Sequence, residues 1–78
     1  MLFRILQDDI VSFLYTNYRG EKTLRSVKVI CIEYYDQSEW HPEEKWFLRC
    51  FDFEKEADRC FTFSGIDADS IVWTSRVK

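Results

Sequence analysis

The sequence predicts a small all-β protein, either a five-stranded barrel or a strongly bent antiparallel sheet. Three observations support this fold class: several short segments alternate between apolar and polar residues, they are rich in β-branched and aromatic residues, and turn-forming residues separate them. The 78 residues leave room for a single domain, 1–78. Aromatic residues make up 18% of the chain, so large rings can fill much of a small core.

The first two strands are expected to form a hairpin. Residues 10–16 alternate as a strand should, and residues 17–22 contain an asparagine and a glycine that suit a tight connection. A second strand is expected from about residue 23 to 35. Because its middle is apolar on both faces, this long strand is expected to bend and to serve two layers of the fold.

The remaining three strands follow a polar, acidic loop over residues 36–45. Residues 46–53 and 57–63 are expected to pair as a second hairpin. Residues 64–67 match the S-x-x-D capping pattern and predict one short helical turn. A last short strand is expected over residues 70–74.

The ends of the chain and its composition indicate a soluble protein of the cytoplasm. Residues 1–9 suit at most a short helix, and charged residues interrupt them too early for a signal peptide. No segment is long enough to cross a membrane. The odd set of three cysteines fits free thiols in a reducing compartment, and the net charge of -3 argues against a protein that coats nucleic acid.

Three arginines lie on segments that otherwise look like core strands: Arg25, Arg49 and Arg59. A buried charge is costly unless it is paired or meets a ligand. Guanidinium groups bind phosphates with two parallel hydrogen bonds, so these arginines are candidates for a ligand site. The alternative is that they form structural ion pairs with acids of the same sheet, namely Glu33, Asp52 or Asp58.

An ordered set of residues resembles the WYL domain family over about residues 10–74. The set comprises the triplet Trp46-Phe47-Leu48 with Arg49 after it, together with a Y-T-N-x-x-G-E opening that starts at Tyr15, a W-H-P-E segment at 40–43, and Arg59-Cys60-Phe61. The chain departs from the family pattern at two positions. Phe47 stands where the triplet has tyrosine, and Val29 stands where the family usually has proline.

The resemblance implies a five-stranded Sm-like barrel that senses a nucleotide or a single-stranded nucleic acid through basic and hydroxyl side chains. It also implies a role in bacterial transcription control or in the regulation of phage defence and CRISPR systems. Such domains commonly follow a helix-turn-helix segment, which these 78 residues do not contain. We therefore expect a binding module that regulates a protein partner or forms a homodimer, with ligand-binding residues Tyr15, Arg25, Arg49, Arg59 and, at the rim, His41.

Two other classes of function compete with this interpretation. One is a protein-interaction or homodimerisation module that uses aromatic edge strands. The other is a small hydrolase, which lacks support because no phosphate loop or nucleophile elbow is present. We expect no catalytic residue, no cofactor and no metal, since His41 and the cysteines lack the close spacing of zinc ligands. Convergence of the arginines on an open pocket would favour ligand binding, and salt bridges away from a pocket would favour protein interaction.

Overall fold

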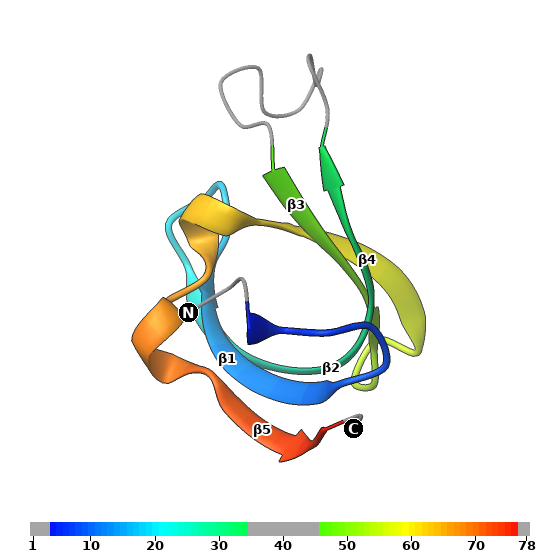
Figure 1. Ribbon diagram of the computed structural model, residues 1–78. Coiled ribbons are helices and arrows are strands. Elements are labelled where there is room, and N and C mark those ends of the chain that lie inside the picture. Colours follow the sequence, from blue (N-terminus) through cyan, green and yellow to red (C-terminus); the bar gives the residue numbers. More distant parts are fainter. Residues whose placement is uncertain (1–3, 35–45, 77–78) are drawn as a thin grey trace.

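The computed structural model describes residues 4–34 and 46–76 and shows a small all-β fold (Figure 1). The five strands form one antiparallel sheet in the order β4-β3-β2-β1-β5. Their bounds lie close to the predicted ranges: β1 Ile10–Thr16, β2 Lys22–Tyr34, β3 Trp46–Asp52, β4 Ala57–Thr62 and β5 Val72–Ser75. None of the described residues forms an α-helix, and none of the helical segments in them is long enough to span a membrane.

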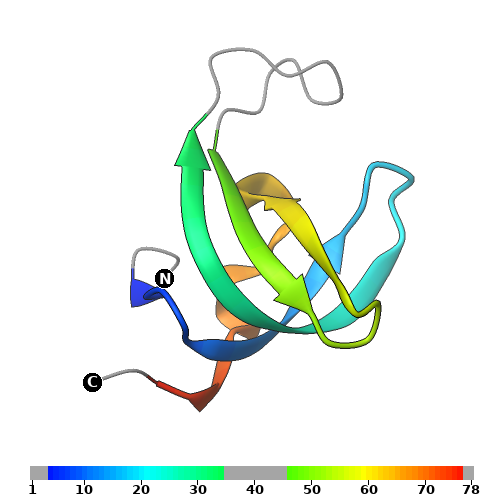
Figure 2. The same ribbon diagram turned by 90° about the vertical axis from the view of Figure 1, so that its right-hand side faces the viewer.

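The long strand β2 bends and pairs with a different neighbour along each half. Its N-terminal part, Lys22–Lys28, pairs with β1, and its C-terminal part, Val27–Tyr34, pairs with β3. The two parts overlap at Val27 and Lys28, which pair with both neighbours. The register shifts between Val29 and Cys31, as expected where a strand changes direction. Figures 1 and 2 show β2 curving around the interior, so the predicted bend is confirmed.

The concave side of this sheet holds the core. The alternation predicted for β1 is correct, because Val11, Phe13 and Tyr15 are all buried. Phe61 from β4 packs edge-to-face on the rings of Phe13 and Tyr15, with centroid separations of 5.4 and 4.8 Å. These contacts hold β4 over β1 even though the two strands are not hydrogen-bonded neighbours. The other core residues are Ile5, Val27, Val29, Leu48, Cys50 and Ile66.

The sheet is strongly bent but does not close into a barrel. In the described part of the chain, β4 pairs only with β3, and β5 pairs only with β1. At the end of β4, the backbone N–H of Thr62 donates to the hydroxyl of Tyr15 instead of to another strand, at 3.2 Å. The chain then leaves the sheet and returns to β1 at a single bridge between Tyr15 and Ile66. The predicted closed, Sm-like barrel is therefore not formed, and the strongly bent antiparallel sheet, the other form predicted, is present.

Two short 3-10 turns replace the single helical turn predicted near 64–67. They are η2, Phe63–Gly65, and η3, Ala68–Ser70. The capping role predicted from the S-x-x-D pattern was wrong, because η2 has no side-chain cap. Asp67 instead caps the second turn, accepting a hydrogen bond from the backbone N–H of Asp69 at 3.1 Å.

The segment before β1 is a docked turn and not an α-helix over its described residues, 4–9. Asp9 is fully buried, and its carboxylate accepts hydrogen bonds from the backbone N–H of Leu6 and from Trp73 Nε1, each at 3.0 Å. Asp8 adopts a left-handed φ of 72° and donates its N–H to the carbonyl of Val29 at 2.8 Å. These polar contacts connect the turn to β2 and β5. The amphipathic pattern of the sequence does not predict them.

Candidate functional site

Arg25 lies on the inner face of the sheet in a buried ion pair. It stands opposite Phe13 in the β1–β2 register, and its side chain is 13% exposed. Its Nη1 lies 3.4 Å from Oδ2 of Asp52, whose side chain is fully buried. The guanidinium also lies over the ring of Phe61, 5.8 Å from the centroid. Among the described residues, Arg25 is held by a structural partner and does not face open space.

Asp52 does more than neutralise Arg25. Its other oxygen, Oδ1, accepts hydrogen bonds from the backbone N–H groups of Glu54 and Lys55, at 3.0 and 3.2 Å. These contacts shape the turn that joins β3 to β4, in the manner usual for an aspartate at the start of a turn. One carboxylate thus connects the turn to the inner face of β2.

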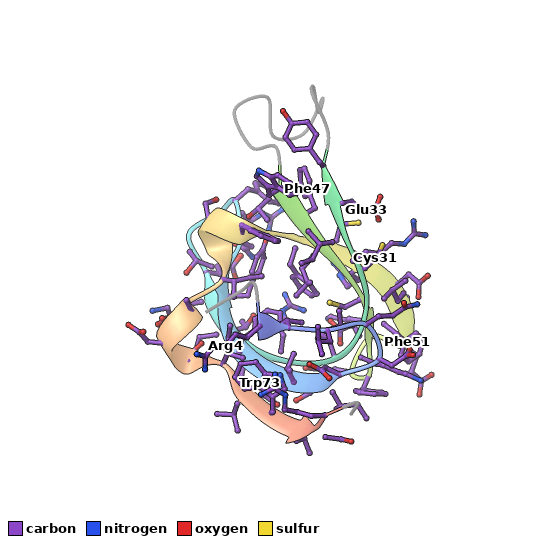
Figure 3. The ribbon with its side chains drawn as sticks, viewed as in Figure 1. Arg4, Cys31, Glu33, Phe47, Phe51 and Trp73 are labelled. Carbon is purple, nitrogen blue, oxygen red and sulfur yellow. The ribbon has the colours of Figure 1, made fainter. Side chains whose placement is uncertain are left out.

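Arg49 lies on the outer face of the sheet, opposite Cys31 in the β2–β3 register. Figure 3 shows Cys31 and Glu33 of β2 on this face. Its Nη1 lies 3.5 Å from Glu33 Oε1, and its Nη2 lies 3.8 Å from Asp58 Oδ2. The pKa of the Arg49 guanidinium is raised, first of all by the charge of Glu33. The side chain remains 46% exposed, so these are surface ion pairs.

The three arginines do not meet at one site. Arg59 stands opposite Cys50 on the inner side of β4, yet it is exposed and forms no ion pair within the described residues. His41, the fifth residue predicted for the ligand site, lies outside the described residues. The ion-pair alternative considered for Arg25 and Arg49 therefore matches their surroundings. By the criterion stated above, this favours protein interaction over a ligand site made by these arginines.

Tyr15, the remaining predicted residue, lies at a pocket of about 270 Å³ between the β1–β2 loop and η2. Its hydroxyl is within hydrogen-bond distance of Thr62 Oγ1, at 3.2 Å, and it accepts from the N–H of Thr62. The lining is rich in hydroxyl groups and is made by Tyr15, Thr16, Asn17, Tyr18, Thr62, Ser64 and Gly65. None of the three candidate arginines lines it.

Gly65 allows the backbone of η2 to approach β1 closely. A Cβ atom built at this position would lie 2.6 Å from Cε1 of Tyr15 and 2.7 Å from the carbonyl oxygen of Thr16. Atoms do not approach this closely, so any side chain would push η2 away from β1. The pocket wall therefore depends on glycine at this position.

Tyr18 forms the exposed rim of the pocket and Arg19 contacts its ring. Both residues were missed by the sequence analysis, which treated them as turn residues. The ring of Tyr18 lines the pocket and is 80% exposed. The Arg19 guanidinium lies over this ring, 5.5 Å from its centroid, and Nε donates to the Tyr18 hydroxyl at 3.1 Å. In the described part of the chain Arg19 forms no ion pair with an acid. The available signal was an aromatic residue beside an arginine in a hairpin loop.

The cysteines offer neither a disulfide nor a metal site in the described residues. Cys31, Cys50 and Cys60 are all free thiols, and only Cys50 is buried. Burial raises the pKa of the Cys50 thiol to about 12 and also raises the pKa of Cys60. Within residues 4–34 and 46–76, no group of three or more His, Cys, Asp or Glu side chains is arranged to hold a metal ion.

Comparisons with protein-family models, with curated proteins and with solved structures find no match to this chain. The resemblance to WYL domains thus depends on the ordered residues named above. The class of protein is defined only by its fold, a small five-stranded antiparallel sheet with two 3-10 turns.

Proposed function

We propose that the chain is a small binding module for a ligand that combines a planar ring with a negative charge, such as a nucleotide or the end of a single-stranded nucleic acid. The observation that carries the proposal is the exposed Tyr18 ring, held by Arg19 at the rim of the hydroxyl-lined pocket. In this proposal the site is the Tyr15 pocket, and Arg25 and Arg49 have structural roles.

The chemistry of the rim suits such a ligand. An exposed aromatic ring offers a surface on which a base can stack, and stacking tolerates any base because each has a π-face. An arginine without a carboxylate partner can form two hydrogen bonds with a phosphate. The hydroxyl groups inside the pocket both donate and accept hydrogen bonds, as the edge of a sugar or base requires.

The overall charge limits the kind of nucleic acid that would bind. The chain carries a net charge of -3, and Glu21 and Asp67 lie near the loop, paired with Asn17 and Lys22. A long duplex would be repelled by most of this surface, whereas a short ligand engages only the rim. If one or two phosphates are contacted, the slope of log affinity against log salt is expected to be about -0.7 to -1.4.

The test is a titration of the protein with a nucleoside monophosphate and with a short labelled single strand, at several salt concentrations. Tyr18→Ala should weaken binding of the single strand by roughly 5-fold to 100-fold, the range of one stacked base. Arg19→Ala should weaken binding and flatten the salt dependence. Arg49→Ala is the matched control and should leave affinity unchanged, because Arg49 lies on the outer face.

Two results would contradict the proposal. Loss of binding in Arg49→Ala with normal binding in Tyr18→Ala would place the ligand at the outer arginine. Absence of binding to any nucleotide or single strand would favour the protein-interaction module, the other class predicted from the sequence.

A further inference from the structure

The two edges of the sheet differ in how well they are protected against pairing with another strand. β5, Val72–Ser75, has only four residues, and its pairing with β1 contains a register shift. β4, Ala57–Thr62, has six residues and pairs regularly with β3 along its whole length. It contains neither proline nor glycine, and Ala57 to Cys60 are exposed. Short length and irregularity protect a sheet edge, so β4 is the edge open to strand addition.

Two hydrogen bonds identify the backbone groups of β4 that point away from the sheet. The N–H of Phe53 donates to the carbonyl of Ser26 at 3.2 Å, which turns the odd-numbered residues of β3 toward β2 and the even-numbered ones toward β4. The N–H of Thr62 donates to the Tyr15 hydroxyl and not to β3. By alternation along β4, the N–H and C=O groups of Asp58 and Cys60 face the free side.

Arg59 lies between these two residues, and its positive charge determines which side chain an added strand should carry opposite it. Its partner across β3 is Cys50, which is fully buried, so Arg59 belongs to the inner face of the sheet. It is nevertheless exposed, and it forms no ion pair in the described part of the chain. A strand added to β4 would place one of its side chains directly opposite Arg59 on this face, within contact distance.

We propose that the β4 edge binds an extended segment of a partner protein by strand addition, and that this segment carries an aspartate or glutamate opposite Arg59. The backbone groups of Asp58 and Cys60 supply the hydrogen bonds, and the Arg59 charge selects the sequence. This interaction surface is separate from the Tyr15 pocket and does not depend on the ligand proposed there.

Arg59 also disfavours binding of a second copy of the chain at the β4 edge. Two β4 strands can use all four free backbone groups of each strand only when Asp58 of one copy pairs with Cys60 of the other. That register places the two Arg59 side chains directly opposite each other, and like charges in this position are destabilising. An inward-pointing charge on an edge strand is a known protection against self-association.

The experiment measures binding of two labelled peptides to the intact chain by fluorescence anisotropy. Both peptides alternate threonine and valine, and they differ only at the centre, which is glutamate in one and lysine in the other. We expect the glutamate peptide to bind about 5-fold more tightly, the range of one cross-strand charge pair. Arg59→Glu should reverse this preference. Lys28→Glu, an exposed strand residue on the outer face with the same change of charge, should retain it.

Cys60→Pro tests the backbone part of the proposal. It removes an N–H that faces away from β3, so the fold should persist in circular dichroism while both peptides lose binding. Equal binding of the two peptides to the unmodified chain, or binding that survives Cys60→Pro, would overturn the proposal. So would a dimer of the unmodified chain, seen by sedimentation, that Cys60→Pro dissociates, because a second copy would then occupy the edge.

Discussion

Arg25 and Arg49 both lie within strands, β2 and β3, but on opposite faces of the same sheet. The Arg25 side chain is 13% exposed and its partner Asp52 is fully buried, whereas Arg49 is 46% exposed and its partner Glu33 is 21% exposed. The stability cost of removing a charged residue's partner therefore depends on which face of the sheet the pair occupies. The inner pair is part of the core, and removing one partner leaves a buried charge. The outer pair is screened by solvent and contributes little.

The largest effect is expected from Asp52→Asn on the inner face. This change keeps the shape of the side chain but leaves the Arg25 charge without its partner, which costs about 3 to 5 kcal/mol of unfolding free energy for a buried pair. In a domain of this size such a loss is a large fraction of the total stability. Urea denaturation followed by tryptophan fluorescence measures it.

Asp58→Asn is the matched control on the outer face, since Asp58 lies 3.8 Å from Arg49 and its side chain is 51% exposed. It should change stability by less than about 0.5 kcal/mol. Equal losses for the two variants would show that the face of the sheet does not decide the cost.

On the inner face, a smaller contribution to stability, from the Cys50 thiol, should depend on pH. Burial raises the pKa of Cys50 from 9.0 to about 12, so the folded state holds this proton after the unfolded state has released it. The resulting stability is fully present below pH 9 and is lost progressively as the pH rises toward 12. At pH 10 the loss from this thiol should be on the order of 1 kcal/mol.

Cys50→Val removes the titrating thiol and so isolates its effect. Other groups titrate in the same alkaline range, and the comparison cancels them because both proteins contain them. Unfolding free energies measured at pH 8 and pH 10 should fall less in Cys50→Val than in the unmodified protein. Parallel decreases would assign the alkaline loss to groups other than Cys50.

A small effect is also expected from Arg49→Ala on the outer face. Breaking its exposed ion pairs should cost less than about 1 kcal/mol, and the difference from the unmodified protein should shrink as salt is added. Chemical denaturation with urea at low and high sodium chloride measures this. A loss of several kcal/mol that persists in high salt would mean that the outer pair behaves like the inner one.

Much of the fold was predictable because it follows from local alternation. The bounds of β1 matched the prediction, and β2 bends as its length and two apolar faces suggested. What could not be predicted depends on contacts between distant residues. The buried Asp52 is paired with Arg25 from another strand, and at the end of β4 the Thr62 N–H donates to the Tyr15 hydroxyl instead of to another strand.

The candidate site was harder to predict than the fold. The strand arginines were predicted to be candidates for a ligand site because a charge on a core-like strand is unusual. The acids that the sequence offered as alternative partners neutralise Arg25 and Arg49. Tyr18 and Arg19 are ordinary in a polar loop, and only the approach of η2 to β1 at Gly65 makes Tyr18 the rim of a pocket. That approach is a three-dimensional property with no local sequence pattern.

The hydrogen bond between Asp9 and Trp73 has a consequence for the order in which β1 acquires its contacts during synthesis. β1 lies between β2 and β5, so β1 acquires its second neighbour only after β5 has been synthesised. Until then the Asp9 carboxylate lacks its indole donor, and the contact between Arg76 Nη2 and the carbonyl of Arg4 cannot form. A nascent chain that stalls before Trp73 exposes one side of β1, the kind of unpaired edge on which chaperones and aggregation act.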